Sequence, residues 1–197
     1  MRARIAIGLM AVLSPALVSA QISTPLDETG QIERGGRAVS YRIRRLPVSS
    51  FPEVPAALQL LLEARGCMIP QTFNAHRPEN LIHGSLERPG SSDWALLCSA
   101  RGTVSLLVYF ASSPGELKVL AEAPETSRLE VRDLSGALGF AWGIDPVSPE
   151  QAHQAQGGLT PRPPRTDHDA LADQLLDQTT IYRYFTGGAW TRLPMPD

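Results

Sequence analysis

The sequence predicts an α+β fold, a mostly antiparallel sheet of short strands with two or three helices covering it. Three observations support this prediction. Short apolar or alternating segments recur along the chain, as expected of strands. Seventeen prolines and 16 glycines in 197 residues indicate frequent turns. A few segments with helix start and stop signals interrupt the strands. Strands joined mainly by turns favour antiparallel pairing.

The predicted sheet centres on residues 93–111, DWALLCSARGTVSLLVYFA, which are expected to form a hairpin. Trp94, Leu96 and Cys98 alternate onto one face of its first strand, and apolar residues also occupy the other face. A strand that is apolar on both faces is expected to be covered on both sides. The turn is expected at residues 100–103.

The N-terminus is typical of a secretory signal peptide over residues 1–20. Arg2 and Arg4 precede an apolar run, residues 5–13, which is too short to span a bilayer. Small residues then end at Ala20, where we expect cleavage. Loss of two arginines changes the formal net charge from −2 to −4. The protein is therefore expected to be periplasmic or secreted and soluble, with no membrane span after processing. The alternative is an uncleaved anchor.

The rest of the chain divides into an N-terminal extension, residues 21–50, and a single α+β domain, residues 51–197. Residues 21–37 are polar and predict a flexible segment. Residues 38–46 alternate, with Val39, Tyr41 and Ile43 on one side, which predicts an edge strand.

Within the domain, three segments carry helix signals. Pro55 and Gly66 bracket a helix over residues 55–65. Ser148 and Gln151 form a capping-box pattern for a short helix that stops at Gly157. The third helix is expected over residues 167–177. Residues 68–80 are expected to be a loop, and the remaining strands are expected at 81–87, 117–121, 129–131, 137–144, 179–185 and 189–193.

Cys67 and Cys98 are the two cysteines of the chain. Export to an oxidising compartment favours a disulfide between them. The alternative is a redox-active pair, but such pairs usually lie in a C-x-x-C motif, which this pair does not form.

Three segments resemble a group of uncharacterised exported bacterial proteins. They are RGCMIP at residues 65–70, DWALLC at 93–98, and the aromatic C-terminal segment 182–197. The resemblance covers residues 51–197 and implies no activity. Residues 84–107 also resemble one integrin-alpha type (FG-GAP) repeat unit, in which an acidic loop binds calcium. Here Glu87 and Asp93 are the only acids of that loop, and Pro89 stands where the repeat has an acidic ligand. Because calcium takes six to eight oxygen ligands, we expect no metal and interpret Asp93 as the cap of a turn.

Familiar catalytic and nucleotide-binding motifs are missing, and no cofactor is expected. The densest polar cluster is Asp167, His168 and Asp169. It can be a helix N-terminus, where carboxylates meet the helix dipole. It can also supply a general base. The catalytic alternative is a hydrolase of unrecognised type that uses Asp93, His168 and Asp169.

The remaining candidates concern binding. Trp94, Trp142 and Trp190 could line a glycan- or peptide-binding face, although aromatic residues in strands are more often core. Arg42, Arg44 and Arg45 could form an anion patch or a solvated strand face. A formal net charge of −2 does not suggest a nucleic-acid partner. We therefore interpret the chain as a non-catalytic envelope protein that binds a protein or glycan, with the hydrolase as the alternative.

Overall fold

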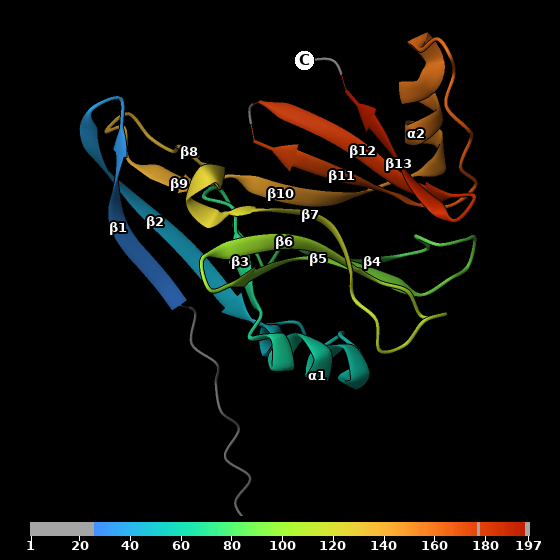
Figure 1. The fold of residues 1–197 in the computed structure, drawn as a ribbon, viewed down its shortest axis with the longest axis horizontal. Helices are drawn as coiled ribbons and strands as arrows, with labels where there is room; N and C mark the ends of the chain where they lie inside the picture. Colours follow the sequence, from blue (N-terminus) through green and yellow to red (C-terminus); the bar gives the residue numbers. More distant parts are fainter. Residues whose placement is uncertain (1–25, 177, 196–197) are drawn as a thin grey trace, which may run out of the picture.

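The computed structural model describes residues 26–176 and 178–195. The expected signal peptide, residues 1–20, lies outside the described residues. Two sheets dominate the described part of the chain (Figure 1). Every described strand pair is antiparallel except that of β2 with β9. The predicted α+β class, with mostly antiparallel pairing, is confirmed at this level.

The large sheet has nine strands, and its middle is the predicted central hairpin. That hairpin pairs from Trp94 opposite Tyr109 to Ala100 opposite Thr103. Arg101 and Gly102 form its turn with φ of 52° and 77°, a left-handed pair typical of a tight two-residue hairpin turn. The order is β7 (Lys118–Pro124), β6 (Thr103–Tyr109), β5 (Asp93–Ala100), β3 (Met68–Gln71), β2 (Arg37–Pro47), β9 (Leu138–Phe140) and β8 (Leu129–Val131), with β1 (Leu26–Arg34) paired to β2 and β4 (Leu81–Gly84) paired to β5.

The small sheet has four strands paired in chain order. They are β10 (Trp142–Val147), β11 (Ala170–Leu175), β12 (Thr179–Thr186) and β13 (Ala189–Pro194). The last two form the predicted C-terminal hairpin, with Gly187 and Gly188 in its turn.

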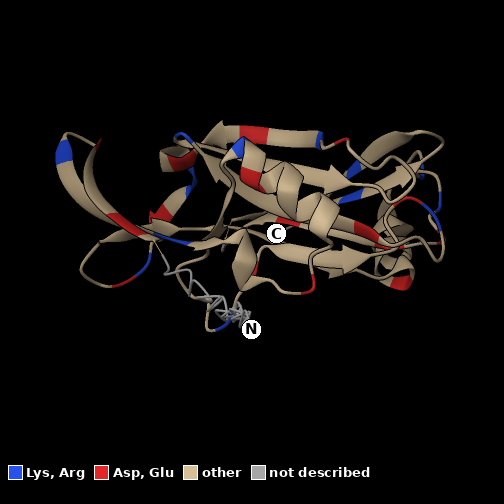
Figure 2. Ribbon diagram, turned by 90° about the horizontal axis from the view of Figure 1, so that it is seen from below, with Lys and Arg blue, Asp and Glu red and all other residues tan. Residues whose placement is uncertain are grey.

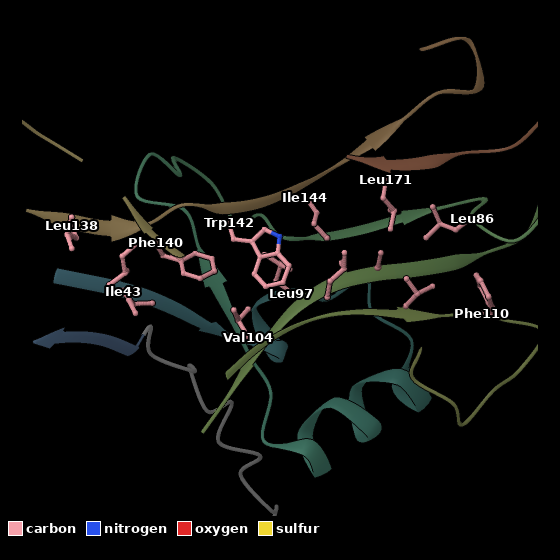
Figure 3. Packing of buried hydrophobic residues seen from close by; sticks show 14 residues of the cluster. Ile43, Leu86, Leu97, Val104, Phe110, Leu138, Phe140, Trp142, Ile144 and Leu171 are labelled. Carbon is pink, nitrogen blue, oxygen red and sulfur yellow. The ribbon is translucent and has the colours of Figure 1, made fainter. Parts of the chain in front are cut away.

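The main core lies between the two sheets (Figure 3). Leu97 and Val104 from β5 and β6 belong to the same buried cluster as Trp142, Ile144 and Leu171 of the small sheet. Each fully buried side chain of this kind contributes roughly 1.5–3 kcal/mol relative to exposure. The opposite face of β5 is also buried, so the predicted cover on both sides of the central hairpin is confirmed.

Helix α1 (Ala56–Arg65) packs against the other face of the large sheet. Leu58 and Leu62 are completely buried in a cluster with Leu96 and Leu107. The helix ends at Gly66, whose φ of 73° is the left-handed conformation that glycine adopts without strain. The stop signal in the sequence is therefore confirmed.

Helix α2 (Pro149–Ala155) packs against the outer face of the small sheet. Its start carries the predicted capping box, because the Ser148 side chain accepts from Gln151 N and the Gln151 side chain accepts from Ser148 N. Ala152 is buried with Tyr184. Each α-helix contacts only part of a sheet, so the expected extensive cover is not seen. The described 3-10 helices are η1 (Val48–Ser50), η2 (Glu125–Arg128) and η3 (Gln156–Gly158).

The predicted third helix, residues 167–177, is wrong. Ala170–Leu175 form β11, which hydrogen-bonds to β10 on one side and β12 on the other. The leucine spacing fits a helix, but two neighbouring strands satisfy the backbone and bury Ala170, Leu171 and Ala172. Tertiary pairing therefore overrides the local pattern.

The N-terminal predictions also need correction. The segment expected to be flexible contains β1, which pairs with β2 over nine residues from Leu26 to Arg34. As a result, β2 is not an edge strand, because β1 lies on one side and β3 and β9 on the other. Residues 68–80, expected to be a loop, begin with β3.

The pairing of β1 with β2 also places the Tyr41 side chain over Gly30. A Cβ atom at Gly30 would come within 2.7 Å of the Tyr41 ring.

Candidate functional site

Asp93 is a structural anchor in this fold. Its side chain is fully buried. Oδ2 accepts hydrogen bonds from Leu86 N at 3.0 Å, Glu87 N at 2.8 Å and the Ser91 hydroxyl, and Oδ1 accepts from Ala111 N at 3.0 Å. Both carboxylate oxygens are thus engaged by groups that fix the turn before β5. This is the turn-capping geometry expected from the sequence.

The cluster of Asp167, His168 and Asp169 does not cap a helix. His168 is buried; its Nε2 donates to the Phe185 carbonyl at 2.7 Å, and its Nδ1 lies 2.8 Å from Asp167 Oδ1. The hydrogen bond with His168 lowers the pKa of the Asp167 carboxyl. Asp169 Oδ2 accepts from Ser85 N at 2.8 Å. Backbone contacts therefore occupy much of this cluster.

The structure does bring Asp93 and Asp169 to the same segment. Asp169 binds the backbone N–H of Ser85, and Asp93 binds that of Leu86, the next residue. Their shared role is to hold the chain between β4 and β5. The oxygens that bind these N–H groups face protein backbone, whereas a catalytic carboxylate must reach a substrate.

The three candidate tryptophans lie in different surroundings. Trp94 is buried against α1 and stacks on His83 at a ring distance of 4.5 Å. Trp142 is buried between the sheets and donates from Nε1 to Asp173 Oδ1 at 2.6 Å. Trp190 is only partly buried, beside Phe110. The structure therefore does not assemble these three side chains into one aromatic face.

One polar cavity in the described residues is lined by three arginines, and we call it the arginine pocket. It encloses about 190 Å³ where β2 meets the loop after β3 and the end of β8. Arg42 and Arg44 come from β2, and Arg132 follows β8. The other residues lining it are Gln71, Thr72, Phe73 and Ala75, so the lining carries three positive charges and no acid.

Gly139 explains how this cavity is shaped. It lies on β9 opposite Arg42 of β2. A Cβ atom at Gly139 would come within 2.4 Å of the Phe73 Cβ and 3.4 Å of the Arg132 Cδ. Only glycine permits such close approach without displacing the backbone. The missing side chain thus lets Phe73 and Arg132 close around the pocket.

The three guanidinium groups differ in their partners. Arg42 pairs with Asp27 at 2.5 Å, and Arg132 lies 3.3 Å from Asp133. Arg44 is partly buried and makes no side-chain hydrogen bond or ion pair with the described residues. Although Asp27 is the cross-strand neighbour of Arg44, its carboxylate turns to Arg42 instead. The pocket therefore contains one uncompensated guanidinium.

A second depression adjoins the pocket, and we call it the hairpin depression. It is a shallow, open hollow of about 420 Å³ and shares Arg42 and Arg132 with the arginine pocket. Its remaining lining comes from the β1–β2 hairpin and the turn before β9: Thr29, Gly30, Gln31, Ser40, Tyr41 and Ala137. Figure 2 shows Lys and Arg interspersed with Asp and Glu along the ribbon.

A third, larger groove lies between α2 and the end of the small sheet. It encloses about 820 Å³, and Gln151, Tyr182, Leu159 and Met195 are among the residues that line it. Its lining contains no charged side chain. Nothing in the described residues selects an occupant for this neutral surface.

Residues 26–176 and 178–195 contain no group of three or more His, Cys, Asp or Glu side chains placed to hold a metal ion. In the same residues no helix is both long and apolar enough to cross a membrane. No protein-family model, curated protein or solved structure matches the chain. The resemblances to exported bacterial proteins and to an FG-GAP unit therefore stay predictions.

Sequence reasoning found part of the arginine pocket and missed the rest. Arg42 and Arg44 were recognisable as a possible anion patch, but Arg45 points to the opposite face of β2 and binds Glu125. Arg132 is 88 positions beyond Arg44 in the chain. The parallel pairing of β2 with β9 brings it near, and no local pattern announces that pairing.

Proposed function

We propose that the protein is an exported, non-catalytic binding protein that holds an anionic group of a protein or glycan partner in the arginine pocket. The observation that carries this proposal is the partly buried Arg44 guanidinium, which has no anionic partner among the described residues and faces a cavity with two further arginines.

The physical reason is the cost of burying a charge. A guanidinium withdrawn from water loses solvation, and a carboxylate or phosphate in bidentate contact restores it with directional, charge-assisted hydrogen bonds. Arg45 shows the compensated case in the same strand, because Glu125 accepts two hydrogen bonds from it at 2.8 and 2.6 Å. Arg44 has the equivalent donors free for an external anion.

Two features support export. The signal-peptide pattern of residues 1–20 predicts cleavage after Ala20, and the disulfide between Cys67 and Cys98 fits an oxidising compartment. Intact mass measurement of the secreted or periplasmic protein should give a chain that begins at Gln21. A mature protein that retains Met1 would contradict this part of the proposal.

The non-catalytic part rests on the contacts of the alternative catalytic residues. A hydrolase based on Asp93, His168 and Asp169 needs a base within reach of a substrate. Asp93 is instead buried with both oxygens bonded, and His168 Nε2 donates to a backbone carbonyl. These contacts favour a structural role for Asp93 and His168.

The binding proposal can be tested with inorganic phosphate as the probe. ¹⁵N-labelled protein is titrated with sodium phosphate at low ionic strength, because added salt screens exposed charges. We expect the shift changes to concentrate at residues 42–44, 71–75 and 132. Arg44→Gln should weaken binding about tenfold, which corresponds to about 1.4 kcal/mol.

Arg192→Ala is the control for loss of an arginine elsewhere, since Arg192 is an exposed arginine on β13, outside the pocket. It should leave phosphate binding unchanged. Shift changes spread evenly over exposed arginines, or equal weakening by Arg44→Gln and Arg192→Ala, would refute the site. Hydrolysis of a chromogenic ester that His168→Ala abolishes at an unchanged melting temperature would refute the non-catalytic assignment.

A further inference from the structure

We infer that the ligand is an acidic saccharide whose carboxylate or phosphate occupies the arginine pocket while its hydroxyl-bearing ring lies in the hairpin depression. This inference rests on the proposed function of the arginine pocket and specifies the chemical class of the ligand. It comes from the contrast between two adjoining cavities that share Arg42 and Arg132.

The hairpin depression presents neutral hydrogen-bonding side chains in a regular array. Thr29 lies opposite Arg42, and Gln31 lies opposite Ser40, in the antiparallel register of β1 and β2. Residues two apart on a strand, and residues directly opposite on its neighbour, point to the same face. Two hydroxyls and one amide therefore accompany the Arg42 guanidinium on one exposed face.

The two cavities are suited to different chemical groups of the same ligand. The arginine pocket is lined by three cations and suits one anionic group. Beside the shared Arg42 and Arg132, the hairpin depression is lined by hydroxyl and amide groups, which both donate and accept hydrogen bonds, as sugar hydroxyls do. The hairpin depression alone, at about 420 Å³, falls in the range of roughly 300–1,000 Å³ that is usual for small-ligand sites.

Other anionic ligands match less of this surface. A free phosphate would use the arginine pocket alone. An acidic peptide carries its charge on flexible methylene stems and offers few hydroxyls to Thr29, Gln31 and Ser40. A saccharide offers several hydroxyls beside its acid, so it can use both the arginine pocket and the hairpin depression.

The test compares four probes by isothermal titration on the full mature protein. They are trigalacturonate, a linear uronic-acid trimer; maltotriose, a neutral linear trisaccharide; a triglutamate peptide; and inorganic phosphate. We expect trigalacturonate to bind at least tenfold more tightly than triglutamate or phosphate, and maltotriose to give no measurable heat. A fifth probe, the sugar phosphate glucose 6-phosphate, distinguishes a phosphate from a carboxylate as the preferred acid.

Variants then separate the two cavities. Gln31→Ala combined with Ser40→Ala should weaken trigalacturonate binding at least threefold and leave phosphate binding unchanged. Both side chains are exposed, so the fold should persist, and the melting temperature checks this. Arg44→Gln should weaken the binding of both trigalacturonate and phosphate, whereas Arg192→Ala should change the binding of neither.

The outcomes distinguish the inference from the proposed function. Equal affinity for triglutamate and trigalacturonate, or no effect of the Gln31 and Ser40 changes, overturns the saccharide while phosphate binding still supports the anion site. Failure of every anionic probe to bind in an Arg44-dependent way overturns both.

Discussion

Replacing Asp93 by alanine tests whether this carboxylate is an anchor or a catalyst. The change removes the acceptor of three backbone N–H groups, those of Leu86, Glu87 and Ala111. A buried donor left without a partner costs roughly 1–3 kcal/mol. The bond from Leu86 N is buried, and those from Glu87 N and Ala111 N are part-buried, so solvent can replace part of what they lose. We therefore expect the free energy of unfolding to fall by about 3–5 kcal/mol in total.

The assay is urea unfolding at neutral pH with the disulfide intact, followed by far-UV circular dichroism. Asp93→Asn keeps one acceptor oxygen but places an amide donor against a backbone donor, so its loss should be smaller, about 1–3 kcal/mol. Glu116→Ala is the control, because Glu116 is exposed and has no side-chain partner among the described residues. A loss below about 1 kcal/mol in Asp93→Ala would refute the anchoring role.

Three further predictions concern other contacts. Thiol titration of the unfolded, unreduced protein should find no free sulfhydryl, and Cys98→Ser should lower stability by about 3–4 kcal/mol, as expected from loop entropy for a separation of 31 residues; two reactive thiols would contradict the disulfide. His168→Ala should lower the free energy of unfolding by about 1–3 kcal/mol, because the Phe185 carbonyl loses its hydrogen-bond donor. Asp167→Ala should not change the melting temperature measurably, since the Asp167 side chain is 80% exposed. Equal effects of the two changes on the melting temperature would contradict these contacts. The hydrogen bond from Arg45 lowers the pKa of Glu28 below its ordinary value of 4.5, so the stability that Glu28 contributes is present above pH 4.5 and is lost as the pH falls through its folded-state pKa. Because its side chain is 49% exposed, this contribution should stay below about 1 kcal/mol, and Glu28→Gln should reduce the loss of stability below pH 4.5; an unchanged acid profile would argue against the pair.

Local sequence signals predicted most helices and strands of the fold, but some segments were assigned to the wrong type of element. The central hairpin, the helix that stops at Gly66 and the capping box at Ser148 depend on interactions within a few residues, so they were predictable. The segment at Leu171 was not, because its strand state depends on β10 and β12 on either side. The β1 strand was missed because six of its nine residues are charged or polar, which masks the alternation typical of strands.

The candidate site shows the same limit more strongly. Asp93 could be recognised as a turn cap because its partners Leu86 and Glu87 lie a few residues away. The contact of Asp169 with Ser85 spans 84 positions, and the arginine pocket depends on β9 lying beside β2. Such arrangements follow from sheet topology, which the spacing of residue types along the chain does not encode.

The alternation of side chains along β2 explains why its arginines have different partners. Alternation sends Arg45 to one face, where the buried carboxylate of Glu125 holds it with two hydrogen bonds and Glu28 adds a third. Breaking such a buried pair costs about 3–5 kcal/mol, so Arg45 is committed to the fold. Alternation sends Arg44 to the other face, where Asp27 is already engaged by Arg42. Arg45 is therefore fully paired with acids. Its chain neighbour Arg44 is partly buried and has no anionic partner among the described residues, so its positive charge can bind an external anion. For this reason we place the binding site at Arg44 rather than at Arg45 or at the aromatic residues.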